Sequence, residues 1–216
     1  MKILDLKKQL KPLYFPSAKK PEIIQIPPMH FAAIDGAIEK GEAPGTSPAF
    51  AERMQALYGI VYTLKFMLKK RKKNPIDYPV MALEGLWWVR GGTFVITKKD
   101  NWLFTVMIMQ PGVITPEIFE AARAELRRKR GDTPAVGRLR LETFDEGWCV
   151  QVMHIGPYAD EPATVERMRA YAEENGYRDC VGLGGKHHEV YLGDPRRADP
   201  TKLKTVLRHP VEKIRS

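Results

Sequence analysis

Four residues of the segment KHHEVYLGDPRR, residues 186–197, have side chains that could do chemistry: His187, His188, Glu189 and Tyr191. Two histidines beside a glutamate could bind a metal ion, and a glutamate near a tyrosine could act in acid–base catalysis. Successive side chains of a strand point to opposite faces, so a strand would place His187, Glu189 and Tyr191 on one face and His188 on the other. The alternation separates the histidine pair and argues against a metal site.

The other metal-ligating and nucleophilic residues give no further site. Cys149 and Cys180 lack the spacing of a metal site or of a disulfide framework. The sequence contains no nucleophile elbow and no cofactor-binding fingerprint. We therefore expect neither a metal ion nor a cofactor, and the two cysteines fit a reducing compartment such as the cytoplasm.

Two glutamates are candidates for the central charge of a binding site. Val190 has the character of a core residue beneath helices, so Glu189 and Tyr191 are expected to face the open side of the sheet, towards the seam between the two halves of the chain. Glu84, in ALEGLWW, is the second candidate. Each glutamate could instead be a solvated strand residue, and Gly85 also makes a turn possible beside Glu84. A carboxylate among aromatic walls loses solvation, which raises its pKa and suits it to acid–base work or to pairing with a cationic ligand.

Aromatic side chains gather in segments that could line one cleft. Trp87 and Trp88 are consecutive, so a regular strand points them to opposite faces. Each aromatic residue taken alone fits core packing, but together they could enclose a flat or cationic ligand. Further aromatic residues in such segments are Tyr58, Tyr62 and Phe66, spaced four apart, and Phe144, Trp148, Tyr158 and Tyr171 in the second half of the chain. The residues expected to bind a ligand are Trp87, Trp88, Tyr62, Phe66, Trp148, Tyr158, Glu84 and His187.

Apolar periodicity and capping residues divide the chain into strands and helices. Ser47-Pro48 and Thr115-Pro116 suit the first turns of helices at 50–71 and 115–130. Pro27-Pro28 favours an edge position or a bulge in the first strand. The expected strands are 22–36, 78–89 with a bend near Gly85, TFVIT at 93–97, 102–111, 148–161 and 187–194, with an extended segment at 138–147 and a further helix at 161–177.

An internal duplication relates the two halves of the chain. The segment WCVQVMHIGPYADE (148–161) is similar to EIIQIPPMHFAAIDG (22–36), and each precedes a loop, a helix and further strands. Two copies of a strand–helix–strand–strand unit are therefore expected. They indicate an α+β fold, in which an antiparallel sheet has helices on one face and a ligand cleft at the pseudo-twofold seam between the copies.

The duplication also sets the expected domain limits. A single domain of residues 21–200 contains the two units, at about 21–111 and 138–195, joined by the helix at 115–130. Residues 1–20 are expected to form a loosely attached arm, and residues 201–216 a polar tail.

The net charge of +9 permits acidic partners, but its position argues against nucleic acid. The basic runs KKRKK (69–73) and RRKR (127–130) each end an apolar-periodic segment, where cations complement the helix dipole. No helix-turn-helix, zinc finger or RNP motif is found. No apolar run could cross a membrane, and the N-terminus is too polar for a signal peptide. We expect a cytoplasmic protein without a membrane partner or a module that reads nucleic acid.

The whole pattern resembles the GyrI-like small-molecule-binding proteins, which share their fold with the effector domains of multidrug-responsive regulators. IPPMHFAAIDG carries the general resemblance, while LEGLWW and HEVYLGDPRR are similar to a stand-alone subfamily. The resemblance covers about residues 20–200. In the regulators a DNA-binding module precedes this domain, and the chain starts almost at the first strand, so a transcription-factor role is disfavoured.

The resemblance also implies a site and an activity. It places an acidic residue of the last strand at the centre of an aromatic pocket, which corresponds to Glu189. Members of the stand-alone subfamily hydrolyse cyclopropane-bearing, DNA-alkylating natural products. The first hypothesis is therefore a hydrolase in which Glu189 orients or deprotonates water and Tyr191 supports the water or the developing oxyanion. The alternatives are a non-catalytic binder of flat or cationic xenobiotics and a protein-interaction module, such as one that contacts gyrase.

Overall fold

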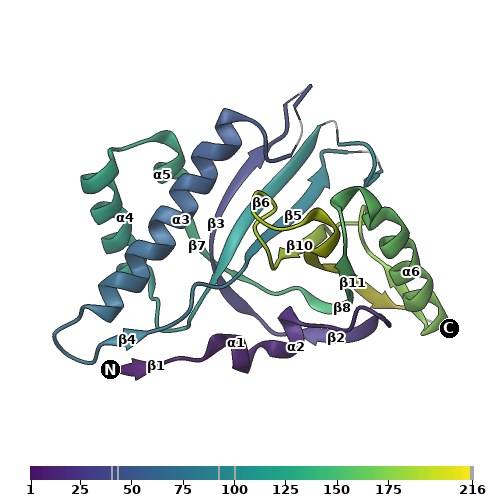
Figure 1. Cartoon of the computed structure of the whole chain (residues 1–216), viewed down its shortest axis with the longest axis horizontal. Helices are drawn as coiled ribbons and strands as arrows, with labels where there is room; N and C mark the ends of the chain where they lie inside the picture. The colour runs from purple at the N-terminus through teal and green to yellow at the C-terminus, as the bar shows by residue number, and fades with distance from the viewer. Residues whose placement is uncertain (40, 43, 92, 100, 215–216) are drawn as a thin grey trace.

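A large antiparallel sheet organises the chain, which we describe from a computed structural model for residues 1–39, 41–42, 44–91, 93–99 and 101–214 (Figure 1). Hydrogen-bonded neighbours follow the order β2-β8-β11-β10-β5-β6-β3-β7, and β9 pairs with the C-terminal end of β11. These strands are β2 (Glu22–Ile26), β3 (Met29–Ala37), β5 (Leu83–Val89), β6 (Trp102–Gln110), β7 (Arg140–Phe144), β8 (Gly147–Ile155), β9 (Tyr177–Asp179), β10 (His187–Tyr191) and β11 (Lys204–Lys213). A separate parallel pair joins β1 (Lys2–Ile3) to β4 (Ile76–Asp77).

The strand order is symmetric about the β5–β10 pair. The first copy runs β3-α3-β5-β6 along the chain and the second runs β8-α6-β10-β11. In the sheet, β6 and β3 lie on one side of the central pair, and β11 and β8 lie on the other. The outermost strands follow the same symmetry, because β2 precedes β3 but pairs with β8, and β7 precedes β8 but pairs with β3. The duplicated α+β fold predicted from the sequence is confirmed.

The C-terminus differs from the prediction. A polar tail is predicted from residue 201, but Lys204–Lys213 forms β11, a central strand between β8 and β10. Its polar appearance comes partly from Arg208 and His209, which are fully buried and hydrogen-bonded. Buried polar side chains are tolerated when each has a partner. The sequence of a central strand can therefore resemble that of an exposed segment. Because β11 belongs to the second unit, this unit extends beyond residue 195.

Three local expectations also change. Pro27-Pro28 separates two strands, since β2 pairs with β8 whereas β3 pairs with β6 and β7. Residues 93–97, predicted to be a strand, form an irregular segment and a turn. Gly85 lies in unbroken register opposite Glu189 and Val106, so β5 has no bulge there.

The long helices cover one face of the sheet (Figure 1). They are α3 (Pro48–Lys69) over the first copy and α6 (Glu161–Glu174) over the second, with α4 (Pro116–Arg130) and α5 (Pro134–Arg138) packed against α3. Ser47 and Thr115 accept hydrogen bonds from the first turns of α3 and α4, as predicted. None of the described helices combines the length and the apolar character needed to cross a membrane.

The opposite face is covered by the N-terminal segment. Residues 1–20 are predicted to be a loosely attached arm, but α1 (Leu6–Gln9) and α2 (Lys11–Tyr14) bury Leu6, Leu13 and Tyr14. Tyr14 reaches Glu84, a side chain of the face to which Val190 also points. The predicted orientation of β10 is therefore reversed: Glu189 lies on the helix side, in the gap between the helices of the two copies.

Candidate functional site

A cleft of about 1970 Å³ opens over the seam between the two copies. Its floor includes Trp87 of β5 with Glu189 and Tyr191 of β10. One wall is the face of α3 that carries Tyr58, Tyr62 and Phe66, and the opposite wall includes Tyr158 and Glu161 at the start of α6. The site therefore takes its floor from the central strands and its walls from the helices of both copies.

Glu189 is the buried carboxylate of the floor, with 7% of its surface exposed. His187 Nε2 lies 2.9 Å from its Oε1. Burial would raise the pKa of Glu189, but the hydrogen bond and the charge of His187 lower it, with smaller contributions from Tyr191 and Lys99. The net effect is a lowered pKa. Glu189 is consequently ionised at neutral pH and can accept a further hydrogen bond or a proton from a bound molecule.

Tyr191 lines the cleft floor, and its hydroxyl group contacts Glu189 and Trp87. Its hydroxyl hydrogen-bonds to the Glu189 carboxylate and accepts a 3.0 Å bond from Trp87 Nε1. Burial and the Glu189 charge raise the pKa of Tyr191 far above its usual value. A Cβ atom at Gly85 would lie 2.8 Å from Trp87 Nε1 and 3.1 Å from the Tyr191 hydroxyl. The glycine therefore provides the space in which this pair meets.

Glu161 is a second buried carboxyl group of the cleft, and sequence reasoning missed it. Only 3% of its surface is exposed, and Thr205 supplies a hydrogen bond. Its Oε1 has no hydrogen-bond partner among the described residues. Burial and the nearby charge of Glu189 raise the pKa of Glu161 to about 9, although Lys99 opposes this. At neutral pH the cleft thus places a protonated Glu161 beside an ionised Glu189.

A chain of buried polar groups continues from Glu189 beneath α6. His187 Nδ1 lies 2.6 Å from His209 Nε2, and His209 Nδ1 lies 2.6 Å from Asp179 Oδ2. Arg169 Nε donates to the same Asp179 oxygen at 2.8 Å. Both histidines are completely buried. The sequence prediction had His187 beside Glu189, but it did not include His209 or Asp179, because β9 and β11 were not recognised as neighbours of this face.

Three residues of this cluster carry side-chain atoms that can bind a metal ion. The ligand atoms of Glu161, His187 and Glu189 all lie within 4.8 Å of one another. Both ring nitrogens of His187 are already engaged in hydrogen bonds, however, and Lys99 contributes positive charge near both carboxyl groups. We therefore describe these three residues as a hydrogen-bonded acid–base group and assign no metal to them. Local spacing could not reveal the cluster, since Glu161 comes from a different element.

The aromatic stripe of α3 has the form that a flat ligand needs. Tyr58 and Tyr62 lie 6.4 Å apart with an interplanar angle of 28°, and Tyr62 and Phe66 lie 6.4 Å apart at 22°. Almost half of the Tyr62 and Phe66 surfaces is exposed. Tyr158 lies edge-on to Tyr191 at 5.9 Å, on the other side of the cleft. Parallel exposed rings along one wall can stack on a planar molecule.

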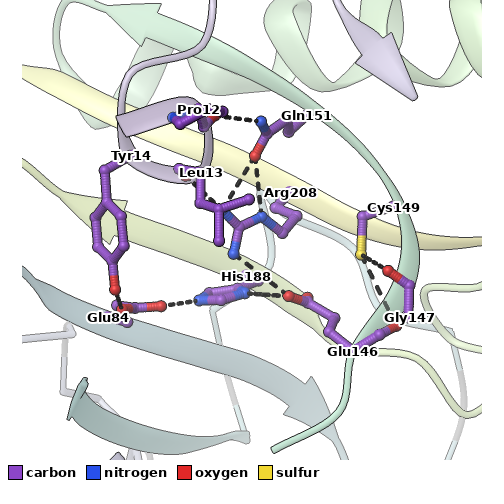
Figure 2. Close-up of polar contacts among 10 residues, drawn as sticks. All are labelled: Pro12, Leu13, Tyr14, Glu84, Glu146, Gly147, Cys149, Gln151, His188 and Arg208. Atoms are coloured by element: carbon purple, nitrogen blue, oxygen red, sulfur yellow. Dashed lines mark hydrogen bonds and ion pairs between the residues drawn. The ribbon is translucent and has the colours of Figure 1, made fainter. Parts of the chain in front are cut away.

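Glu84 and His188 lie on the far face of the sheet, in the network shown in Figure 2. His188 donates from Nε2 to Glu84 at 3.0 Å and from Nδ1 to Glu146 at 3.0 Å. Tyr14 donates to Glu84 at 2.5 Å, and Arg208 donates to the backbone oxygen of Leu13. Burial would lower the pKa of His188, but Glu146 and Glu84 raise it to about 9. The structure thus places Glu84 in a structural ion network and not in the cleft, which excludes it as a ligand-binding residue of the floor.

Two tryptophans are not among the residues that line the cleft. Trp88 points away from Trp87 and lies under Lys186 Nζ, 3.8 Å from the ring centroid. Trp148 of β8 is exposed and lies 6.4 Å from Tyr177. Of the residues predicted from the sequence, the cleft brings together Trp87, Tyr62, Phe66, Tyr158, Glu189 and Tyr191, with His187 behind Glu189.

Comparison with protein families identifies one match over most of the chain. Residues 19–212 match the family described as the GyrI-like small molecule binding domain. None of the curated proteins matches the chain.

Solved structures give a similar result. The chain is 40% identical to an uncharacterized conserved protein from Listeria innocua, with a TM-score of 0.86 and coverage of 97% of this chain and 100% of the other. It is 38% identical to a protein from Listeria innocua described as a hydrolase, with a TM-score of 0.81 and coverage of 97% and 100%. The C-terminal domain of EcmrR is 13% identical, covers 90% of this chain and 98% of that domain, and with a TM-score of 0.51 shows the fold alone.

Proposed function

Since the chain belongs to the GyrI-like family of small-molecule-binding domains, we propose that its cleft binds flat hydrophobic molecules and hydrolyses them. The observation that supports this most strongly is the pair of carboxyl groups on the cleft, Glu189 ionised and Glu161 protonated. Two carboxyl groups whose pKa values are pushed apart are suited to opposite roles as base and acid. A similar protein from Listeria innocua is described as a hydrolase, which agrees with a catalytic role.

The proposed substrates are conjugated molecules that contain a strained cyclopropane ring. Such a molecule would stack on the Tyr62 and Phe66 rings and direct its reactive end toward Glu189. Ring strain supplies much of the driving force, so the enzyme needs to position water and exclude bulk solvent. Opening the ring of a cyclopropyl dienone would detoxify a DNA-alkylating compound.

The proton balance of the reaction assigns a role to each carboxyl group. Glu189 takes a proton from water while the water oxygen forms a bond to a cyclopropane carbon. The carbon–carbon bond breaks, its electron pair moves through the dienone, and the carbonyl oxygen becomes a phenol oxygen. Glu161 gives its proton to that oxygen, and the proton on Glu189 then returns to Glu161. In this proposal Tyr191 holds the Glu189 carboxylate in place, whereas the sequence suggested that it supports the water or the developing oxyanion.

Turnover distinguishes a hydrolase from a binding protein. A cyclopropyl dienone in at least 50-fold excess over the purified protein should be converted completely to ring-opened phenol, as measured by chromatography and mass spectrometry. Protection limited to one equivalent per protein, with no ring-opened product, would show that the cleft only binds.

A binding experiment tests the position of the cleft separately. Tyr62→Ala should weaken the binding of a flat aromatic ligand about 5-fold, because one stacking contact contributes about 1 kcal/mol. Trp148→Ala is the matched control, since Trp148 and Tyr62 are each 47% exposed but Trp148 lies outside the cleft. Equal losses in the two variants would contradict the assignment of the cleft.

A further inference from the structure

The buried chain from Glu189 through His187 and His209 to Asp179 has hydrogen bonds whose directions can be derived. Asp179 faces three donors: the backbone N–H of Val181 on Oδ1, and Arg169 Nε and His209 Nδ1 on Oδ2. Burial would raise the pKa of Asp179, but His209, Val181 and Arg169 lower it to about 2. Asp179 is thus an ionised acceptor, so the proton of its 2.6 Å bond belongs to His209 Nδ1.

The direction at Asp179 determines the next bond. Burial lowers the pKa of His209 to about 4, so its ring is neutral and its Nε2 carries no proton. His209 Nε2 is therefore an acceptor, and His187 Nδ1 must donate across the 2.6 Å between the two rings. If His187 Nδ1 carried no proton either, two acceptors would face each other across this distance.

The last link is the contact between His187 and Glu189. Since His187 already donates from Nδ1, a neutral His187 would turn a bare Nε2 toward the ionised carboxylate of Glu189, 2.9 Å away. Two acceptors at this distance repel each other unless a proton lies between them. His187 must then donate from both nitrogens. The other titratable groups around His187 and Glu189 are Lys99, Glu161, Tyr158 and Tyr191.

We propose that Asp179, which does not line the cleft, fixes the direction of the hydrogen bonds in this chain and so keeps His187 protonated on both nitrogens beside Glu189. His187, His209 and Asp179 are positioning residues: they hold Glu189 as an ionised base beside a protonated imidazole. This role builds on the proposed hydrolysis, but the directions of the hydrogen bonds follow from the structure alone. The sequence does not indicate this role, because Glu189 and His187 lie on β10, His209 on β11 and Asp179 on β9.

Asp179→Asn is the variant expected to reverse the direction of the hydrogen bonds between residue 179, His209 and His187. The backbone N–H of Val181 holds an oxygen at the Oδ1 position, whereas Arg169, whose side chain is 42% exposed, can turn away from the Oδ2 position. The amide nitrogen therefore takes the position that faces His209 Nδ1. His209 can then accept only if its proton moves to Nε2, after which it donates to His187 Nδ1. His187 becomes a neutral Nε2–H donor to Glu189, and the additional proton is lost.

Nitrogen-15 NMR of the histidine rings tests this without a substrate. In the wild-type protein His209 should be the neutral Nδ1–H form, and His187 should be protonated on both nitrogens; each signal is assigned with a single His→Gln variant. In Asp179→Asn both rings should become neutral Nε2–H forms. A wild-type His209 protonated on Nε2, or identical His209 signals in the two proteins, would overturn the proposal. The wild-type spectrum decides this even if the variant does not fold.

The pH profile of hydrolysis tests the consequence for the site. Without the charge of His187, the pKa of Glu189 should rise, so the acid limb of kcat/KM should move to higher pH by at least one unit in Asp179→Asn. KM should remain within 2-fold, since Asp179 does not line the cleft. Asp179→Glu should restore much of the profile by restoring the charge.

Glu212→Gln is the control for this experiment. It removes another carboxylate from the β9–β11 pair, one that bonds to Arg178 at the exposed edge, and it should leave the spectra and the profile unchanged. Reversed hydrogen bonds in Asp179→Asn with an unchanged pH profile of kcat/KM would show that the directions are as proposed but have no catalytic consequence. Absence of turnover in every protein, together with the predicted NMR spectra, would instead refute the hydrolase proposal and support the proposed hydrogen-bond directions.

Discussion

At the scale of single residues, the proposed site contains two glutamates placed in different electrostatic surroundings. Glu189 faces His187 and the Tyr191 hydroxyl, which favour its charged form. Glu161 faces Glu189 from α6 and has one carboxyl oxygen without a protein partner among the described residues. An unsatisfied buried oxygen is costly unless a ligand or water satisfies it. Glu161 is thus the group that a bound molecule can satisfy and receive a proton from.

Glu161→Gln should lower kcat at least 10-fold, since a glutamine cannot donate the proton that the developing phenolate needs. In the wild-type protein Glu161 is protonated below its pKa of about 9, so the rate should fall as the pH rises through about 9. The variant should lose this basic limb and keep its acid limb. Measurement of kcat from pH 5 to 10 in both proteins checks this, and an unchanged basic limb in the variant would remove Glu161 from the reaction.

At the scale of elements, β5 and β10 form the floor because their register brings Gly85 beside Glu189. This register turns Trp87 into the cleft and points Glu84 and Trp88 to the other face. Period-two alternation therefore predicts which residues share a face. It does not predict which face carries the helices, and this is why the predicted orientation of Glu189 was reversed.

Gly85→Ala should disturb the floor without unfolding the sheet. The new methyl group would lie 2.8 Å from Trp87 Nε1, closer than such contacts occur, and would break its bond to Tyr191. We expect at least a 10-fold loss of kcat/KM with little change in the melting temperature. Gly112→Ala, where a Cβ atom would have no neighbour within 4 Å and which lies outside the cleft, is the control. Full activity in Gly85→Ala would contradict a positioning role for the Trp87–Tyr191 pair.

Sequence patterns located most elements but only part of the site. Ser47 and Thr115 marked the helix starts, and the repeated motif revealed the duplication. Glu161 gave no signal, because acidic residues are common in the first turn of any helix. His209 was missed for a different reason: β11 combines buried ionic and apolar side chains, and only its neighbours show that its polar groups are satisfied.

At the scale of the whole molecule, the two faces of β10 belong to different sites. One face holds His187, Glu189 and Tyr191 at the cleft. The other face holds His188 in the network of Figure 2, through which the N-terminal segment is hydrogen-bonded to the sheet. Removing one partner from such a buried network leaves the remaining groups unsatisfied, which costs several kcal/mol. The N-terminal segment is therefore a structural cover of the sheet.

The stability of the protein should fall at alkaline pH through His188. Its folded pKa of about 9 lies above its ordinary value of 6.5, so its stabilising contribution is complete below about 6.5 and is lost as the pH rises through 9. The melting temperature should decrease between pH 7 and 10. Glu161 titrates in the same range, so the informative quantity is the difference in slope between wild type and His188→Gln. Equal slopes would show that His188 is not charged in the folded protein.

The most direct test of the central claim is multiple-turnover hydrolysis of a cyclopropyl dienone by wild type, Glu189→Gln and Glu84→Gln. Both glutamates are buried and lie on adjacent strands, but only Glu189 faces the cleft. We predict a rate at least 10-fold lower for Glu189→Gln at unchanged ligand affinity, whereas Glu84→Gln should lose stability but keep the rate per folded molecule. A Glu189→Gln rate equal to that of the wild type, or equal losses in the two variants, would contradict the account.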